Sequence, residues 1–128
     1  MAGSTSVLDK TYVADGAFLK YSVVLYGDED YHCKAPVARA DGKIAGVTQA
    51  STVASGDTVL VRKMGITKVI ASEAFNKGEP LVINDIEGRV YDPLFFASGD
   101  GIVAVAEESA ATSGDIVDAW LQVRDELG

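Results

Sequence analysis

Two stretches of the sequence share one pattern, and that pattern decides the expected fold. Residues 44–59 read IAGVTQASTVASGDTV, and residues 102–117 read IVAVAEESAATSGDIV; aligned without gaps, they are identical at seven positions. Each stretch has a strand-like run, a small polar loop, Ser-Gly-Asp and a second strand-like run. Glycine permits a turn with positive φ, and the aspartate can hydrogen-bond the backbone nearby. Two copies of such a β-loop-β unit predict a pseudo-symmetric small barrel; the alternative is chance similarity in a chain rich in Ala, Val and Gly.

The rest of the chain also reads as short strands. Alternation with a period of two over residues 18–26 predicts one buried face that carries Leu19, Tyr21, Val23 and Leu25. Similar runs recur about every ten residues with turn signals between them, which is typical of a barrel or sandwich. A single helical turn is expected at residues 73–77. The sequence therefore predicts an all-β fold, a small β-barrel or sandwich-like body. Its expected core comprises Leu19, Tyr21, Val23, Val47, Val59, Val61, Val105, Val117, Leu121 and Val123.

The last expected strand carries an unusual aromatic residue. Val117, Ala119, Leu121 and Val123 share an apolar face, whereas Trp120 lies on the opposite, polar face. A tryptophan in such a place is either covered by a loop or used at an interface. Trp120 is therefore a candidate for a contact between subunits.

The termini and composition suggest how the chain is organised. Residues 1–10 are small and polar and are expected to form a flexible N-terminal arm, whereas residues 11–128 are expected to form a single β-rich domain. The first residues lack the features of a signal peptide, and no apolar stretch is long enough to span a membrane. We therefore expect a soluble protein made in a cytoplasm.

The charge argues against binding to nucleic acid or to an anionic membrane. The formal net charge is −8, from 11 basic and 19 acidic residues. Binding to nucleic acid depends on neutralising phosphates with Lys and Arg, and anionic lipids attract the same residues. Neither partner is expected here.

No catalytic, metal or cofactor site is predicted. The one histidine, His32, is next to the one cysteine, Cys33, so the two side chains of a strand would point to opposite faces. One His and one Cys cannot make a zinc site alone. The run Asp28-Glu29-Asp30 lacks the spacing of a calcium loop and is interpreted as a solvated turn.

The order and spacing of these patterns from about Tyr12 to Val123 resemble the capsid cement, or head-decoration, family of tailed bacteriophages. The matching parts are a valine-rich first strand, Ile44–Val47, Ser55-Gly56-Asp57 with Val59–Val61, Gly65–Val69, Phe75–Val82 before Gly88–Val90, and Gly101–Glu107 followed by Ser113–Val117. The long first strand and the Asp28–Asp30 turn depart from the family pattern.

The resemblance implies a non-enzymatic virion protein that binds the outer surface of the assembled capsid and stabilises it. Its partner would be the major capsid protein, it would form a homotrimer, and it would be made in the bacterial host cytoplasm. Family members often engage the shell partly through an N-terminal arm, so the expected contact residues are Ser4, Thr5, Ser6, Val7, Leu8 and Asp9.

Two other readings stay open at the level of sequence. A β-barrel ligand-binding module or small enzyme would need a pocket with converging polar groups. A secreted carbohydrate-binding module would need exposed rings, whereas aromatic residues make up 8% of the chain.

Overall fold

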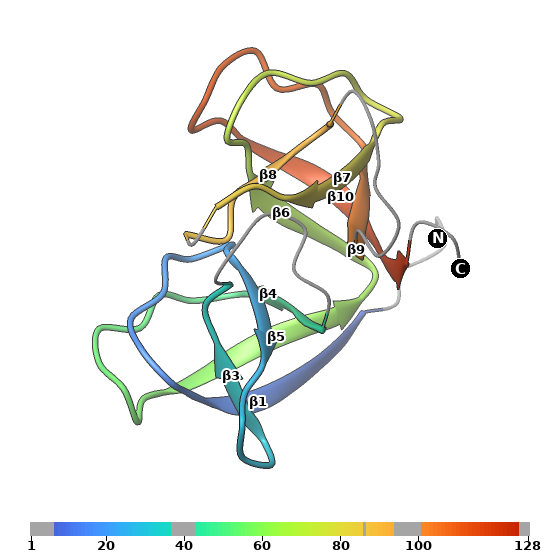
Figure 1. Ribbon diagram of the computed structural model, residues 1–128. Helices are drawn as coiled ribbons and strands as arrows, with labels where there is room; N and C mark the ends of the chain where they lie inside the picture. The colour runs from blue at the N-terminus through green and yellow to red at the C-terminus, as the bar shows by residue number, and fades with distance from the viewer. Residues whose placement is uncertain (1–6, 37–42, 86, 94–100, 126–128) are drawn as a thin grey trace, which may run out of the picture.

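The computed structural model describes residues 7–36, 43–85, 87–93 and 101–125, and within this part of the chain it contains strands and no helix. The all-β prediction is confirmed. Figure 1 shows the first five strands below and the last five above. The strands are β1 (Leu8–Ala14), β2 (Val23–Tyr26), β3 (His32–Lys34), β4 (Ile44–Thr48), β5 (Thr58–Met64), β6 (Ile66–Ile70), β7 (Pro80–Ile83), β8 (Val90–Tyr91), β9 (Gly101–Ala106) and β10 (Ile116–Asp125).

Strands β1–β5, here called the first repeat, form a closed barrel in the order β1-β3-β2-β4-β5. The barrel closes because β1 pairs with β3 in parallel and with β5 in antiparallel orientation. Because the sheet is closed, each of the described strands β1–β5 has a partner on both sides.

Strands β6–β10, the second repeat, form a sheet in the order β6-β10-β9-β7-β8. This is the same order as in the first repeat, with β6 matching β1 and β10 matching β5. The closing pair is reduced here to one parallel bridge, Ala71↔Val90, where the first repeat pairs Ala14 with Cys33. The second repeat is thus a version of the same barrel that is closed by this single bridge and not by a ladder of several paired residues.

The two Ser-Gly-Asp turns have matching geometry. Gly56 and Gly114 have φ values of 97° and 92°. The Gly56 N–H donates to Ala14 O and the Gly114 N–H donates to Ala71 O, both at 2.8 Å. The repeat predicted from the two aligned stretches is therefore present in the structure, and it extends to all ten strands.

The buried cores repeat in the same way. Inside the first barrel lies a cluster of Tyr12, Ala14, Phe18, Val24, Cys33, Ala45, Val59 and Val61. The matching residues of the second repeat are all buried in the largest cluster: Val69, Ala71, Phe75, Leu81, Val90, Val103, Val117 and Ala119. That cluster also holds Val23, Leu25, Ile44 and Val47. The two repeats therefore share buried side chains.

Strand β2 corrects the expected period of two. Val23, Val24 and Leu25 are all buried, because Val24 faces the barrel interior and its neighbours belong to the cluster shared with the second repeat. Leu19, expected in the core, precedes the strand and is 48% exposed. Tyr21 is only partly buried and has a φ of 67°.

Three further expectations need correction. Leu8–Lys10 do not belong to a flexible arm, because they pair with β5 as part of β1. Val123, expected in the core, is 44% exposed; it follows Leu121, after which the register of β10 with β9 shifts. The helical turn expected at residues 73–77 is absent; Phe75 instead bridges Ala110, the counterpart of the Phe18–Thr52 bridge.

Candidate interaction surfaces

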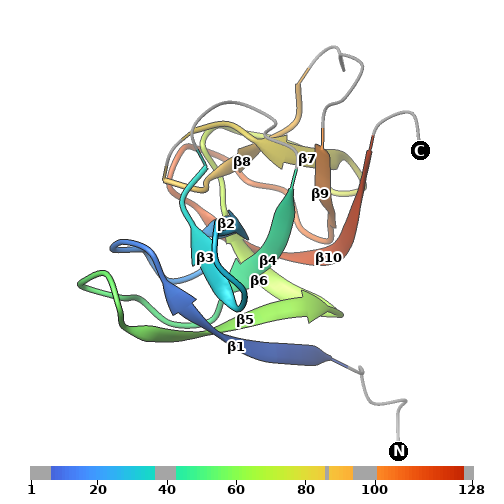
Figure 2. The same cartoon turned by 60° about the horizontal axis from the view of Figure 1, so that its bottom comes forward.

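Strand β5 passes into β6 at a corner that lies at one end of the molecule in Figure 2, and the strands that meet there carry exposed apolar residues. Leu8 pairs with Met64, and the two are 51% and 59% exposed. Beyond Gly65, Ile66 pairs with Trp120, which is 49% exposed. We call the exposed Leu8, Met64 and Trp120, together with the partly buried Ile66, the corner surface. Its apolar exposure makes it a candidate interface.

The two repeats differ at this corner. Ile66 and Trp120 match Asp9 and Arg62 of the first repeat, where the Arg62 Nε–H donates to Asp9 Oδ1 at 2.8 Å and an Nη2–H donates to Oδ2 at 3.1 Å. This hydrogen bonding to Asp9 raises the pKa of Arg62. Asp9, a predicted capsid contact, is thus held by its own chain, and an apolar pair replaces the ion pair in the second repeat.

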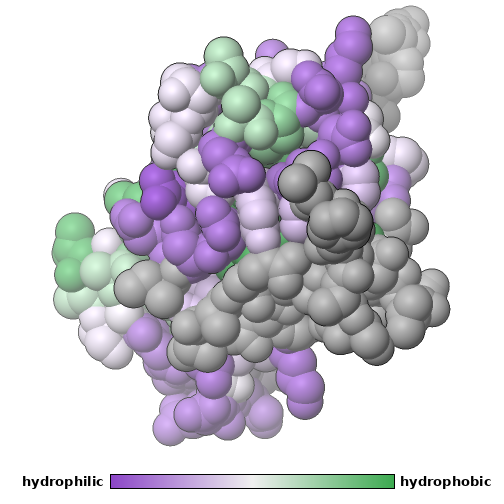
Figure 3. Space-filling model, turned by 45° about the horizontal axis from the view of Figure 1, so that its top comes forward, coloured by the Kyte–Doolittle hydropathy of each residue, from purple (hydrophilic) through white to green (hydrophobic). Residues whose placement is uncertain are grey.

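Another side of the molecule is more polar. In the view of Figure 3, hydrophilic residues cover much of the described surface, and hydrophobic areas are small and separate. Val53, in the loop after β4, is 86% exposed but stands apart from the corner surface in sequence and pairing. The corner surface is therefore the better candidate for a large apolar contact.

His32 and Cys33 point to opposite faces of β3, as predicted. Cys33 is fully buried in the first barrel, and desolvation raises the pKa of its thiol to about 11. His32 lies between two carboxylates, with Nδ1 at 2.7 Å from Asp15 Oδ1 and Nε2 at 3.1 Å from Glu29 Oε2. The hydrogen bond to Asp15 raises the pKa of His32 above its ordinary value. The Cys33 thiol is therefore inaccessible to solvent, and the His32 imidazole links the segments that carry Asp15 and Glu29.

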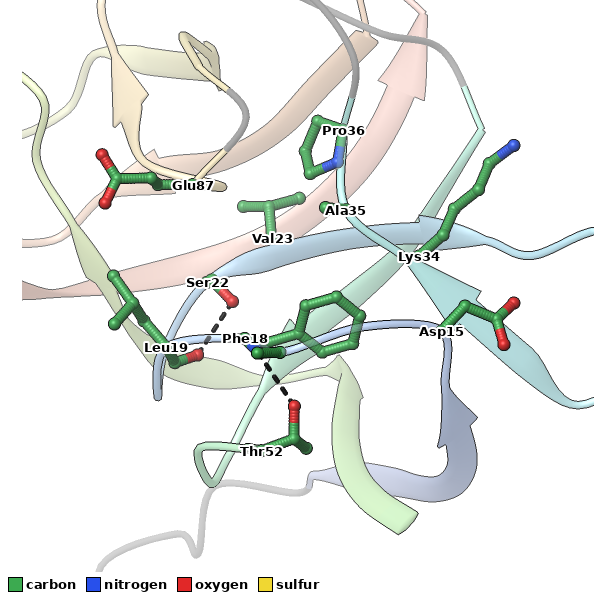
Figure 4. Close-up of a pocket in the computed structure, with 11 residues that line it drawn as sticks. Asp15, Phe18, Leu19, Ser22, Val23, Lys34, Ala35, Pro36, Thr52 and Glu87 are labelled. Carbon is green, nitrogen blue, oxygen red and sulfur yellow. Dashed lines mark hydrogen bonds between the residues drawn. The ribbon is translucent and has the colours of Figure 1, made fainter. Parts of the chain in front are cut away.

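The entrance of the first barrel holds an open pocket of about 760 Å³ (Figure 4). Phe18 closes its floor, and the Phe18 N–H donates to Thr52 Oγ1 at 2.9 Å. Among the described residues that line the pocket, only Asp15, Lys34 and Glu87 ionise. Asp15 is already bound to His32. This lining offers an apolar hollow with charges at its rim and no nucleophile next to a base.

The described residues offer neither a metal site nor a membrane-spanning helix. Within the described ranges, no three His, Cys, Asp or Glu side chains gather where they could hold a metal ion. The same part of the chain has no helix long and apolar enough to cross a bilayer.

The predicted contact residues are only partly placed. Ser4, Thr5 and Ser6 lie outside the described residues. Val7 and Leu8 are exposed, and Trp120 is exposed as its pattern suggested. The sequence did not reveal Met64 as an exposed residue or Ile66 as a partly buried residue beside it. Their signal was an apolar residue on each side of Gly65, which marks a corner between two strands rather than a core strand.

A solved structure has a fold similar to that of this chain. It is the crystal structure of the head fiber gp8.5 N base of bacteriophage phi29, with a TM-score of 0.67 and 19% identity. The similarity covers 91% of this chain and 95% of the other. No family model and no curated protein matches the chain. The two chains therefore share a fold over nearly their whole lengths, and the similarity is to a phage head fiber base rather than specifically to the cement family.

Proposed function

We propose that this chain is a structural, non-enzymatic protein of a phage virion that binds the outer surface of the assembled capsid and stabilises it. The observation that carries the proposal is the fold shared with a phage head fiber base over 91% of this chain and 95% of the other. Because both chains are covered almost completely, the likeness concerns the whole double repeat and not one small barrel.

Attachment would use the start of the chain and the corner surface. Leu8 pairs with Met64, and both Val7 and Leu8 are exposed, so β1 begins at this apolar area. In the proposal, Ser4–Leu8 contact the major capsid protein, and Asp9 acts indirectly by fixing the base of this segment to Arg62. The capsid would bury side chains that the free protein leaves in water.

The subunits would associate as a homotrimer through Trp120. Large exposed aromatic residues are common anchors of interfaces. Asp118, on the same strand face as Trp120, is paired, with Lys68 Nζ at 3.0 Å from Asp118 Oδ1. A locally neutral surface suits self-association in a chain with a net charge of −8. Three weak capsid contacts on one trimer would sum to tight attachment.

The test is to locate the chain in particles of the phage that encodes it. A specific antibody should label the outside of intact heads in immunogold electron microscopy. Heads made without the chain should lose the label and release their DNA at a lower temperature. Adding purified protein to those heads should restore both properties. Absence of the chain from purified particles, or heads that are equally heat-resistant without it, would contradict the proposal.

A further inference from the structure

Tyr31 occupies a position where the repeat uses glycine. It matches Gly88 of the second repeat, and the φ values are 64° and 75°. Both backbones are therefore in the left-handed region, which glycine adopts without steric cost and tyrosine does not. The Tyr31 residue is 66% exposed, so it adds little to the core. The fold explains the backbone at this position but not the choice of a tyrosine.

The second repeat shows what this face of a barrel can do. Its residues Ile83, Gly88 and Leu121 are buried where the first repeat packs against it. The Val23 N–H donates to Gly88 O at 2.9 Å, and a Cβ on Gly88 would lie 2.5 Å from Val23 O. In the second repeat this face binds the first repeat, and the close contact with the Val23 backbone is possible only because residue 88 has no side chain.

The same face of the first repeat is open and carries different residues. Tyr26, Tyr31 and Lys63 replace Ile83, Gly88 and Leu121. We call Lys10, Tyr12, Tyr26, Tyr31 and Lys63 the tyrosine face. The second repeat binds the first through close contact between Gly88 and the backbone of Val23, and the Tyr31 side chain would block the same contact here. Another copy of this chain therefore cannot bind this face in the way that the first repeat binds the second. The face therefore suits a ligand of another kind.

Hydrogen bonds hold the tyrosine face in shape. The Lys63 ammonium donates to Tyr12 Oη at 2.7 Å, to Tyr26 Oη at 3.1 Å and to Ala45 O at 2.8 Å. These three bonds use its three N–H groups. The rings of Tyr12 and Tyr26 meet edge to face, with centroids 6.3 Å apart. These contacts hold the Tyr26 ring in place before any ligand binds, and Tyr26 is still 47% exposed.

A pocket of about 590 Å³ lies between this face and the turn at Asp28–Asp30. Tyr26 and Tyr31 supply exposed rings, and Lys10 Nζ lies 4.7 Å from the centroid of the Tyr31 ring. Asp28 and Asp30 are exposed; Asp28 Oδ1 accepts a hydrogen bond from Lys34 Nζ at 3.4 Å, and the remaining lone pairs of the two carboxylates can accept others. The lining thus combines ring faces, hydrogen-bond acceptors and the ammonium group of Lys10, with charges of both signs.

We propose that the pocket between the tyrosine face and the Asp28–Asp30 turn binds a neutral saccharide. A sugar offers C–H faces that stack on tyrosine rings, hydroxyl donors for the carboxylates and oxygen acceptors for Lys10. A strongly charged ligand of either sign would meet repulsion from part of the lining. This inference does not depend on the capsid role, because the pocket and the corner surface have no residue in common.

The test begins with the intact protein on an array of neutral oligosaccharides. The best-bound soluble oligosaccharide is then titrated into the ¹⁵N-labelled protein. We expect amide shifts at Lys10, Tyr26, Asp30 and Tyr31. Tyr31→Gly keeps the backbone conformation that the position requires, so its melting temperature should not fall, whereas binding should weaken at least tenfold. Val53→Ser, a change of an exposed residue outside the pocket, is the matched control and should bind as the unmodified protein does.

Three results would overturn the inference. The array could show no bound saccharide, the shifts could map to another surface, or Tyr31→Gly could bind as strongly as the unmodified protein. Burial of Tyr31 against another protein chain in purified particles, together with an empty array, would assign the face to a protein partner instead.

Discussion

Asp57 and Asp115 make the same hydrogen bonds at matching places in the two repeats. Oδ2 of Asp57 accepts from the N–H groups of Val53 and Ala54, at 3.0 and 3.1 Å. Oδ2 of Asp115 accepts from the N–H groups of Ala111 and Thr112, at 2.8 and 3.2 Å. Each carboxylate thus closes its turn through the amides three and four residues earlier. The identity of Ser-Gly-Asp in the two stretches has this physical basis.

Replacing either aspartate by alanine should therefore have a similar cost. Each change removes two hydrogen bonds to a carboxylate in an exposed turn, and we expect a loss of about 1–2 kcal/mol in the free energy of unfolding. Urea denaturation of Asp57→Ala and Asp115→Ala measures both. Asp28→Ala, in a turn that lacks these bonds, is the control and should change little. A large cost for one aspartate and none for the other would show that the turns are not equivalent.

Glycines separate into two classes that the structure distinguishes. At Gly56, φ is positive but a Cβ would meet no atom within 4 Å, so Gly56→Ala should cost only about 1 kcal/mol of backbone strain. At Gly88 a Cβ would meet the backbone of Val23, and at Gly46 it would collide with the carbonyl oxygen of Arg62. Alanine at either should cost about 3 kcal/mol or more, because backbone must move. Thermal melts of the three variants test this order, and equal costs would contradict the close packing of the repeats at Gly88.

Much of the fold was predictable because turn chemistry is local. Ser-Gly-Asp, the residues beside Gly65 and the β-branched runs specify strands and corners without reference to distant parts of the chain. The burial of single strands was less predictable. Alternation assigns one buried face to β2, whereas Val23 and Val24 are both buried because β2 lies between two barrels. The arm predicted from the sequence extends too far, to Lys10, because the pairing partner of Leu8–Lys10, β5, lies about fifty residues away in sequence.

The candidate surfaces were predictable only in part, for a similar reason. Trp120 stood out because it interrupts the polar face of a strand. Tyr31 gave no such signal, because its interest lies in the match with Gly88, which requires the register of both repeats. Met64 and Ile66 are not among the predicted contact residues, because their position on either side of a corner depends on how β5 and β6 pair with β1 and β10.

Stability should depend on pH through His32. Its pKa is raised, chiefly by the hydrogen bond to Asp15, from an ordinary value of 6.5. A raised pKa means that the protonated form is favoured in the folded state, so the stabilisation is complete below pH 6.5 and is lost as pH rises through the folded pKa. An NMR titration of the His32 ring should give a pKa above 6.5 that falls in Asp15→Asn. An unchanged pKa in that variant would assign the shift to Glu29.

The start of the chain should have separable structural and binding roles. Pairing of β1 with β5 begins at Leu8, and the Asp9–Arg62 ion pair follows immediately. Deleting residues 2–10 should therefore lower the melting temperature, because Arg62 loses its carboxylate and β5 loses part of its partner strand. Deleting residues 2–6 leaves every one of these contacts in place, so the melting temperature should stay unchanged.

If Ser4–Leu8 contact the capsid, this shorter deletion should still weaken binding to expanded capsids, by at least tenfold in a sedimentation assay. The ordering of a short segment costs about 1–2 kcal/mol per residue in backbone entropy, so each arm contributes modestly and the loss should be largest where three arms act together. Arg62→Gln, which weakens the anchor but keeps residues 2–6, is the matched variant. It should lower the melting temperature with a smaller effect on binding. Unchanged capsid binding after deletion of residues 2–6 would leave the corner surface, and not the arm, as the site of attachment.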